Sequence, residues 1–106
     1  MTRTVQELLV ELRHGLNALY GERLTGLYVY GSYARGEQRW DSDLDVLVIL
    51  RSLEGYGSEI DRTSELISSV SLRHGISVSR VFVDDSAWRE GETGFLSKLR
   101  MEAIAA

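Results

Sequence analysis

The chain has 106 residues, of which 43% are hydrophobic, enough for one domain spanning 1–106 around a single core. Its 12 basic and 16 acidic residues give a net charge of −4, which argues against an extensive basic surface for nucleic acid. The lack of cysteine excludes disulfides and thiolate metal sites and predicts a cytoplasmic protein, and the longest apolar run, Val46 to Leu50, is too short for a membrane span.

The first predicted element is an amphipathic helix that begins at Thr4, because leucines recur there at helical spacing. Thr4 and Glu7 form a capping-box pattern, and Gly21 is a typical helix stop. A strand is expected at 24–30, where β-branched and aromatic residues are bounded by glycines.

A second strand is expected at 44–50, which is apolar on both faces except at Asp45. This pattern is typical of a central strand covered on both sides. The next helix is predicted over 58–74, with Ser58 and Asp61 as caps and Gly75 as the stop.

A third strand at 76–85, a turn near Trp88 and a closing helix at 93–104 complete the predicted order. Helix, strand, turn, strand, helix, strand, helix predicts an α/β (α+β) fold, with a small mixed sheet of about three strands flanked by helices. Three strands leave at least one sheet edge that a partner could cover. The pattern does not decide whether Trp40 and Trp88 are core residues or partner anchors.

Two aspartates stand where the central strand begins. Asp43 and Asp45 are two residues apart, so their carboxylates lie on one face of an extended chain. Like charges beside a hydrophobic core are destabilising unless a cation joins them. The pair therefore predicts a site for Mg²⁺ or Mn²⁺, which accept oxygen ligands and take the rest of their shell from water and substrate phosphates.

Gly31 and Ser32 follow the preceding strand and are candidate phosphate ligands. A glycine lets the backbone approach an anion closely, and the serine offers a hydroxyl and an N–H. A phosphate site beside a metal site suits phosphoryl or nucleotidyl transfer. Arg35 either pairs with Glu37 or neutralises phosphate charge, and Asp41 is interpreted as a turn residue.

Three common motifs do not fit the same stretch. Glu37 and Gln38 stand where a P-loop requires lysine followed by serine or threonine. Val46 replaces the glycine of an EF-hand loop, and Ser32 breaks a dinucleotide-binding glycine pattern.

Gly31-Ser32, then Ala34-Arg35-Gly36, then Asp43-Leu44-Asp45 resembles the signature of the minimal nucleotidyltransferases of the DNA polymerase β superfamily. The resemblance covers nearly the whole predicted order of elements. It implies transfer of a nucleoside monophosphate from an NTP, usually ATP, with Mg²⁺ held by the two aspartates. It also implies a protein partner, since many such domains are antitoxins paired with a helical HEPN-type ribonuclease toxin.

One position departs from the family pattern. The family places a third carboxylate near the start of the next strand, where this chain has Ser77. That group would help to activate the acceptor hydroxyl. Asp84 and Asp85 are seven and eight residues further on, about 25 Å along a strand, so they do not replace it.

The sequence therefore leaves several functions open. The first is a Mg²⁺-dependent nucleotidyltransferase that acts on a hydroxyl of a partner protein. The second, motivated by Ser77, is a nucleotide-binding antitoxin that neutralises its toxin by forming a complex. Transfer to an aminoglycoside is a weaker third, because such enzymes carry an additional domain. A second copy of the chain is also a possible partner.

Overall fold

The computed structural model describes residues 1–91 and 93–106, and its centre is a mixed four-stranded sheet in the order β3-β2-β1-β4. Strand β1 (Leu24–Tyr30) is antiparallel to β2 (Leu44–Leu50), which is parallel to β3 (Val78–Asp84). Strand β4 (Ile104–Ala105) is antiparallel to the other side of β1. The α/β fold and its three main strands are confirmed.

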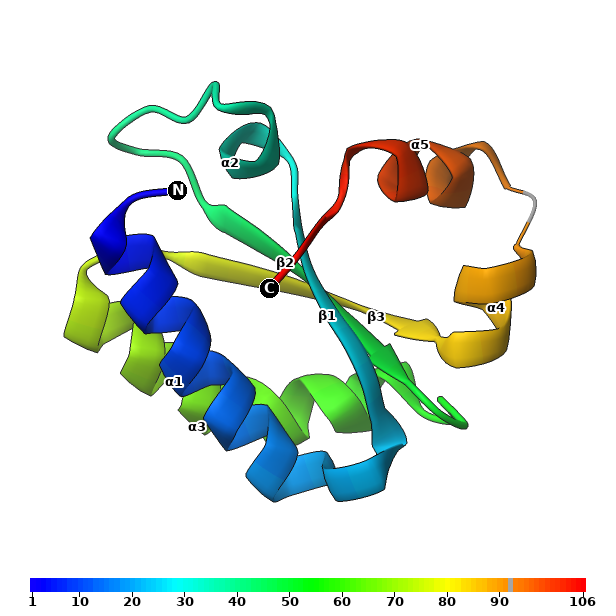
Figure 1. The fold of residues 1–106 in the computed structure, drawn as a ribbon. Helices are drawn as coiled ribbons and strands as arrows, with labels where there is room; N and C mark the ends of the chain where they lie inside the picture. Colours follow the sequence, from blue (N-terminus) through cyan, green and yellow to red (C-terminus); the bar gives the residue numbers. More distant parts are fainter. Residues whose placement is uncertain (92) are drawn as a thin grey trace.

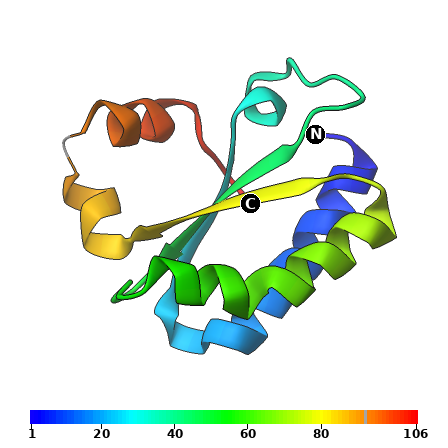
Figure 2. The ribbon, with the colours of Figure 1, turned by 180° about the vertical axis from the view of Figure 1, so that it is seen from behind.

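Two long helices cover one face of the sheet, as Figures 1 and 2 show from opposite sides. They are α1 (Arg3–Tyr20), which runs into the short 3₁₀ helix η1 (Gly21–Arg23), and α3 (Tyr56–His74). Their buried side chains join those of alternate strand residues in the main core; the helix residues are Val5, Leu8, Leu9, Leu12, Leu16, Tyr20, Ile67 and Val70.

The opposite face carries two shorter helices, α4 (Asp85–Glu90) and α5 (Gly94–Glu102). The buried side chains of this second core are Leu47, Ile49, Val83, Leu96 and Leu99. Strand β2 is therefore covered on both faces, as its continuous apolar run predicts. The Trp88 ring packs 5.2 Å from the Tyr28 ring in this layer, whereas Trp40 is 95% exposed.

The predicted N-terminal caps of both long helices are wrong, whereas Gly21 and Gly75 end α1 and α3 as predicted. Helix α1 begins one residue earlier than expected, because Thr2 is extended and its hydroxyl accepts a hydrogen bond from the Val5 N–H. Helix α3 begins at Tyr56, since the Glu59 N–H donates to the Gly55 carbonyl and closes the first turn there. Ser58 and Asp61 thus lie inside α3 and do not cap it.

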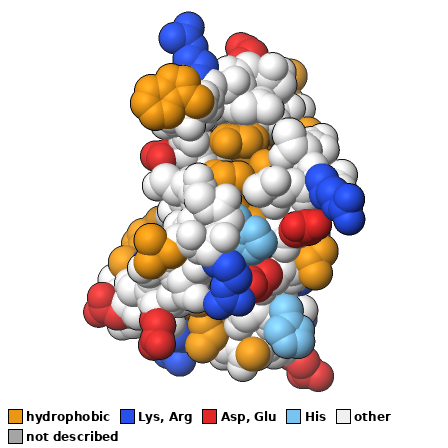
Figure 3. Space-filling model, turned by 90° about the vertical axis from the view of Figure 1, so that its left-hand side faces the viewer, with side chains coloured by type: hydrophobic (Ala, Val, Ile, Leu, Met, Phe, Trp, Pro, Cys, Tyr) orange, Lys and Arg blue, Asp and Glu red, His pale blue; other side chains and the backbone are white. Residues whose placement is uncertain are grey.

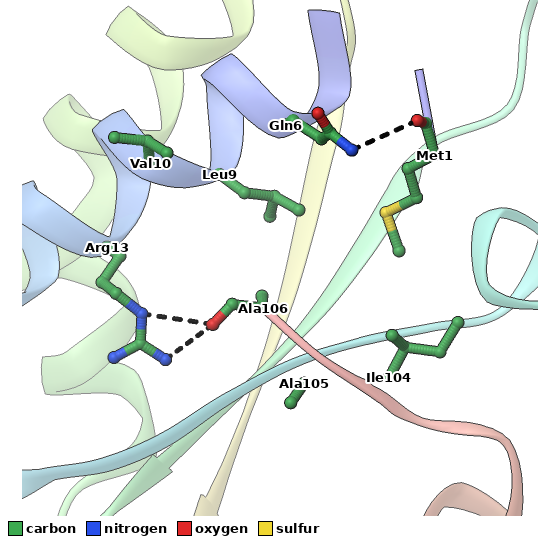
Figure 4. Close-up of a pocket in the computed structure, with 8 residues that line it drawn as sticks. All are labelled: Met1, Gln6, Leu9, Val10, Arg13, Ile104, Ala105 and Ala106. Carbon is green, nitrogen blue, oxygen red and sulfur yellow. Dashed lines mark hydrogen bonds between the residues drawn. The ribbon is translucent and has the colours of Figure 1, made fainter. Parts of the chain in front are cut away.

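The predicted closing helix is also too long, and the sheet has one strand more than the three that the sequence predicts. Helix α5 ends at Glu102, and residues 104–105 pair with Val29 and Tyr28. The Ala106 N–H donates to the Leu27 carbonyl, and Arg13 donates to the Ala106 carbonyl at 3.2 and 2.8 Å (Figure 4). The end of the chain therefore covers part of one sheet edge, that of β1.

The surface agrees with the acidic net charge. On the face shown in Figure 3, Lys and Arg side chains are interspersed with Asp and Glu, and hydrophobic side chains lie in separate patches. Among the helices that the structure describes, none is both long and apolar enough to cross a membrane.

Candidate nucleotide and metal site

The predicted site residues lie at the end of the sheet where β1 stops and β2 starts. Tyr30, the last residue of β1, pairs with Asp45 of β2. Gly31 follows, and the one-turn helix α2 (Ser32–Arg35) begins directly after it (Figure 1). Antiparallel pairing thus brings the Gly31-Ser32 turn beside the aspartates, which are 11 to 14 residues away in sequence.

Gly31 is required for this close approach. Its φ of 73° lies in the region that side chains disfavour, and a Cβ at this position would overlap Asp45 Oδ2. The absence of a side chain therefore lets the turn lie against the aspartate.

The two aspartates differ in exposure. Asp43 precedes β2 and is exposed, whereas Asp45, within β2, is half-buried. Burial, followed by the negative charges of Asp43 and Glu102, raises the pKa of Asp45, although Arg35 opposes this rise. A cation between the carboxylates would relieve this unfavourable charge.

The donor set fits a hard divalent cation. Asp43 and Asp45 offer oxygen atoms only, as Mg²⁺ and Mn²⁺ prefer. Within 1–91 and 93–106, no three acidic, histidine or cysteine side chains come together as a ready set of metal ligands. The protein would therefore supply two carboxylates and leave the remaining positions to water and substrate phosphates.

The register of the parallel pair shows which residues at the start of β3 lie beside the aspartates. Asp45 lies opposite Ser79, and the Ser77 carbonyl accepts a hydrogen bond from the Leu44 N–H at 2.8 Å. Ser77 and Ser79 are two residues apart in extended chain, so both belong to the strand face that carries Asp45. Neither offers a carboxylate.

The acids further along β3 lie at the other end of the sheet. Asp84 pairs with Leu50, and its carboxylate accepts hydrogen bonds from the backbone N–H groups of Ser86 and Leu53. Asp84 therefore caps α4 and does not join the aspartate pair, as the strand length predicts.

Arg35 makes two ion pairs, only one of which the sequence suggests. Its guanidinium contacts Glu37 at 3.0 Å, as expected, and Glu102 of α5 at 3.1 Å. The Gly31 N–H also donates to Glu102, at 3.3 Å. Glu102 is thus a site residue that sequence reasoning missed, since no motif spacing connects a position 57 residues beyond Asp45 with this turn.

Two further residues complete the description. Asp41 lies in a turn in which the Ser42 N–H donates to the Arg39 carbonyl, as its interpretation as a turn residue requires. Tyr30 packs against the second core, and burial, followed by the charge of Asp45, raises the pKa of its phenol.

An apolar pocket lies elsewhere on the described part of the chain. It is lined by α1 and the end of the chain, from residues that include Leu9, Arg13 and Ile104 (Figure 4). Neither Gly31 nor the aspartates line it, so this pocket is separate from the predicted nucleotide and metal site.

The model of the nucleotidyltransferase domain family matches residues 9–92. The chain belongs to this family. The matched range holds the Gly31-Ser32 turn, both aspartates and strands β1 to β3. It stops before α5 and β4, so Glu102 lies outside the part of this nucleotidyltransferase domain that the family model describes.

One relative and two solved structures resemble this chain. A proposed protein adenylyltransferase from Methanocaldococcus jannaschii is 27% identical over 75 residues, which cover 71% of this chain and 75% of that protein. A toxin–antitoxin crystal structure with AMP-PNP superposes with a TM-score of 0.64 and 18% identity, covering 93% of this chain and 69% of the other. The crystal structure of a proposed nucleotidyltransferase from Sulfolobus solfataricus superposes with a TM-score of 0.61 and 18% identity, covering 97% of this chain and 76% of the other. The two structures share the fold of this domain.

Proposed function

We propose that this nucleotidyltransferase domain moves a nucleoside monophosphate, most simply AMP from ATP, onto a hydroxyl group of a partner protein in the cytoplasm, and that it requires Mg²⁺ or Mn²⁺. The observation that carries the proposal is the contact between the Gly31 turn and Asp45, because it would place a phosphate site beside a metal site. The adenylyltransferase relative and the AMP-PNP complex support ATP as the nucleotide and a protein as the acceptor.

In this proposal the residues divide the work between phosphate binding and metal binding. The Gly31 N–H, Ser32 and Arg35 bind the phosphates, and Asp43 and Asp45 hold the cation. The acceptor oxygen forms a bond to the α-phosphorus, the bond from that phosphorus to pyrophosphate breaks, and the hydroxyl proton leaves to solvent. A bound divalent cation supplies charge neutralisation for the departing pyrophosphate.

The transfer is tested with α-labelled ATP, Mg²⁺ and the protein encoded by the adjacent gene. We expect label on the partner, and a loss of more than about 100-fold in Asp43→Asn and Asp45→Asn, because even outer-shell groups of metal sites contribute about 10- to 100-fold. Asp41→Asn, which changes the nearby turn only, is the matched control. Equal labelling by wild type and Asp45→Asn would contradict the enzymatic proposal.

The metal site is tested separately by thermal unfolding. We expect Mg²⁺ to raise the Tm of wild type but not of Asp45→Asn, because a ligand that binds only the folded state stabilises it. Without metal we expect Asp45→Asn to be the more stable protein at pH 7, since burial and Asp43 penalise the ionised Asp45. A Mg²⁺-dependent rise that persists in the variant would place the cation elsewhere.

For the partner we propose a helical HEPN-type toxin, on the strength of the resemblance and of the toxin–antitoxin structures that share the fold. The adjacent gene is then expected to encode an all-helical protein. A β-rich product there would contradict this partner.

A second candidate function is a nucleotide-binding antitoxin that acts by complex formation alone. Ser77 and Ser79 favour it, because they leave the aspartate pair without a third carboxylate from β3. It predicts that Asp43→Ala still neutralises the toxin in a co-expression growth assay. Loss of neutralisation in this variant, with the complex still formed on size exclusion, would favour the enzyme.

A further inference from the structure

Glu102 accepts hydrogen bonds from two of the groups that, in the proposed function, bind the nucleotide phosphates. One carboxylate oxygen accepts from the Gly31 N–H at 3.3 Å, and the other accepts from Arg35 Nη1 at 3.1 Å. A backbone N–H and a guanidinium are also the donors that bind a phosphate. The carboxylate therefore satisfies both donors as an anionic ligand would.

The fold holds Glu102 at this position from both sides. Before it, Leu96 and Leu99 of α5 are buried against the second face of the sheet. After it, Ile104 and Ala105 pair with β1. The Glu102 side chain is itself only 18% exposed, so it lies against the turn as a packed group and does not extend freely into solvent.

The charge balance explains how the contact can be reversed. The charges of Asp43, Glu102 and Arg35 all act on Asp45, and Arg35 is also paired with Glu37, so acidic side chains outnumber basic ones around the turn. A triphosphate adds further negative charge and needs the same two donors, so it cannot bind beside the Glu102 carboxylate. A divalent cation that accompanies the nucleotide offsets the added charge once the carboxylate has left.

We propose that the Glu102 carboxylate occupies the place of a nucleotide phosphate, so that nucleotide binding displaces it from Gly31 and Arg35. This inference rests on the proposed function. It makes the segment 94–106 an internal competitor that lowers the affinity of the empty site for nucleotide and for stray anions. A partner that draws this segment away would switch the site toward binding.

The test measures binding of AMP-PNP with Mg²⁺ by titration calorimetry in wild type, Glu102→Gln and Glu37→Gln. Glu37 pairs with the same arginine but does not contact Gly31, so it controls for the general effect of removing one acid. We expect Glu102→Gln to bind about tenfold more tightly than wild type, because the competing state is weakened. Glu37→Gln is expected to change affinity by less than about twofold.

Each outcome separates the two proposals. Binding that is equal in wild type and Glu102→Gln, or equally tightened in both variants, would overturn the competition while leaving the nucleotide site intact. Weaker Mg²⁺-dependent binding in Glu102→Gln would overturn it in favour of a metal-ligating role. No binding by any of the three proteins would contradict the nucleotide site itself and the inference with it.

A second measurement does not depend on the folding of one variant. In wild type, the ¹H and ¹⁵N shifts of the Gly31 and Glu102 amides are expected to move together during the AMP-PNP titration, and Glu102→Ala should reproduce the tighter binding. Nucleotide binding that moves Gly31 while Glu102 stays unchanged would contradict displacement.

Discussion

At the scale of single residues, the site depends on the absence of a side chain at Gly31. Gly31 has a positive φ, and its backbone lies so close to Asp45 Oδ2 that a Cβ would overlap this atom. Both features require a residue without a side chain. The same contact keeps one aspartate partly out of water and raises its pKa. The close approach of the Gly31 turn to Asp45 and the unfavourable charge of that aspartate therefore both follow from the contact between them.

We expect Gly31→Ala to lower the free energy of unfolding by about 1–3 kcal/mol, because the alanine would be strained and would push Asp45 aside. Urea unfolding followed by circular dichroism measures this loss. Gly57→Ala is the control, since Gly57 lies in helix α3 with open space around it and should be neutral or stabilised. Equal effects of the two substitutions would contradict a specific role for Gly31.

At the scale of elements, a buried glutamate connects the two helices of the first face. Glu59 of α3 is 4% exposed and accepts hydrogen bonds from Tyr20 at the end of α1 and from Arg23 and Arg62. Burial alone would raise the pKa of Glu59, but these three hydrogen bonds outweigh it and lower the pKa. The ionised carboxylate is therefore favoured by the folded state.

The stability from Glu59 is expected to depend on pH. A lowered folded-state pKa contributes stability that is present above the ordinary glutamate value, near 4.3, and is lost as the pH falls through the folded value. Glu59→Gln should cost about 1.5–3 kcal/mol at pH 7 and clearly less near pH 3, as measured by urea unfolding. Glu65→Gln, exposed on the same helix, is the control. If the difference in unfolding free energy between wild type and Glu59→Gln were the same at both pH values, the ionised carboxylate would not be the source of the stability.

The elements were predictable where a periodic pattern is long. The leucine spacing of α1 and the apolar run of β2 give their type and approximate range, because burial of one face or of both faces sets those patterns. Their ends were less predictable. Thr2, not Thr4, caps α1, since several hydroxyl residues near a helix start can serve and the backbone conformation chooses among them.

At the scale of the whole molecule, the sheet separates two cores that must fold together. Leu12 belongs to the core beneath α1 and α3, whereas Trp88 packs at the second core beneath α4 and α5. Both cores use alternate side chains of the same strand β2, so neither layer has a complete partner surface without the other. We infer that the described part of the chain unfolds as one unit.

We expect Leu12→Ala to cost about 2–5 kcal/mol, because Leu12 is completely buried. The far-ultraviolet circular dichroism of the helices and the near-ultraviolet circular dichroism of the tryptophans should show unfolding transitions at the same urea concentration. Val10→Ala, 72% exposed on the same helix, should change stability by less than about 0.5 kcal/mol. Separate transitions for the two signals would contradict a single folding unit.

The sequence by itself determined the fold class, the three main strands and the local pattern of glycine, serine and two aspartates, because these depend on periodicity and on residues close together in the chain. Only the tertiary structure decided that β4 closes the β1 edge, that Ser79 lies opposite Asp45 and that Glu102 reaches Gly31 and Arg35. Strand register and contacts across about 70 residues leave no periodic trace in a single sequence. They follow from how the strands pair and how the helices pack on the sheet, which is a property of the whole core.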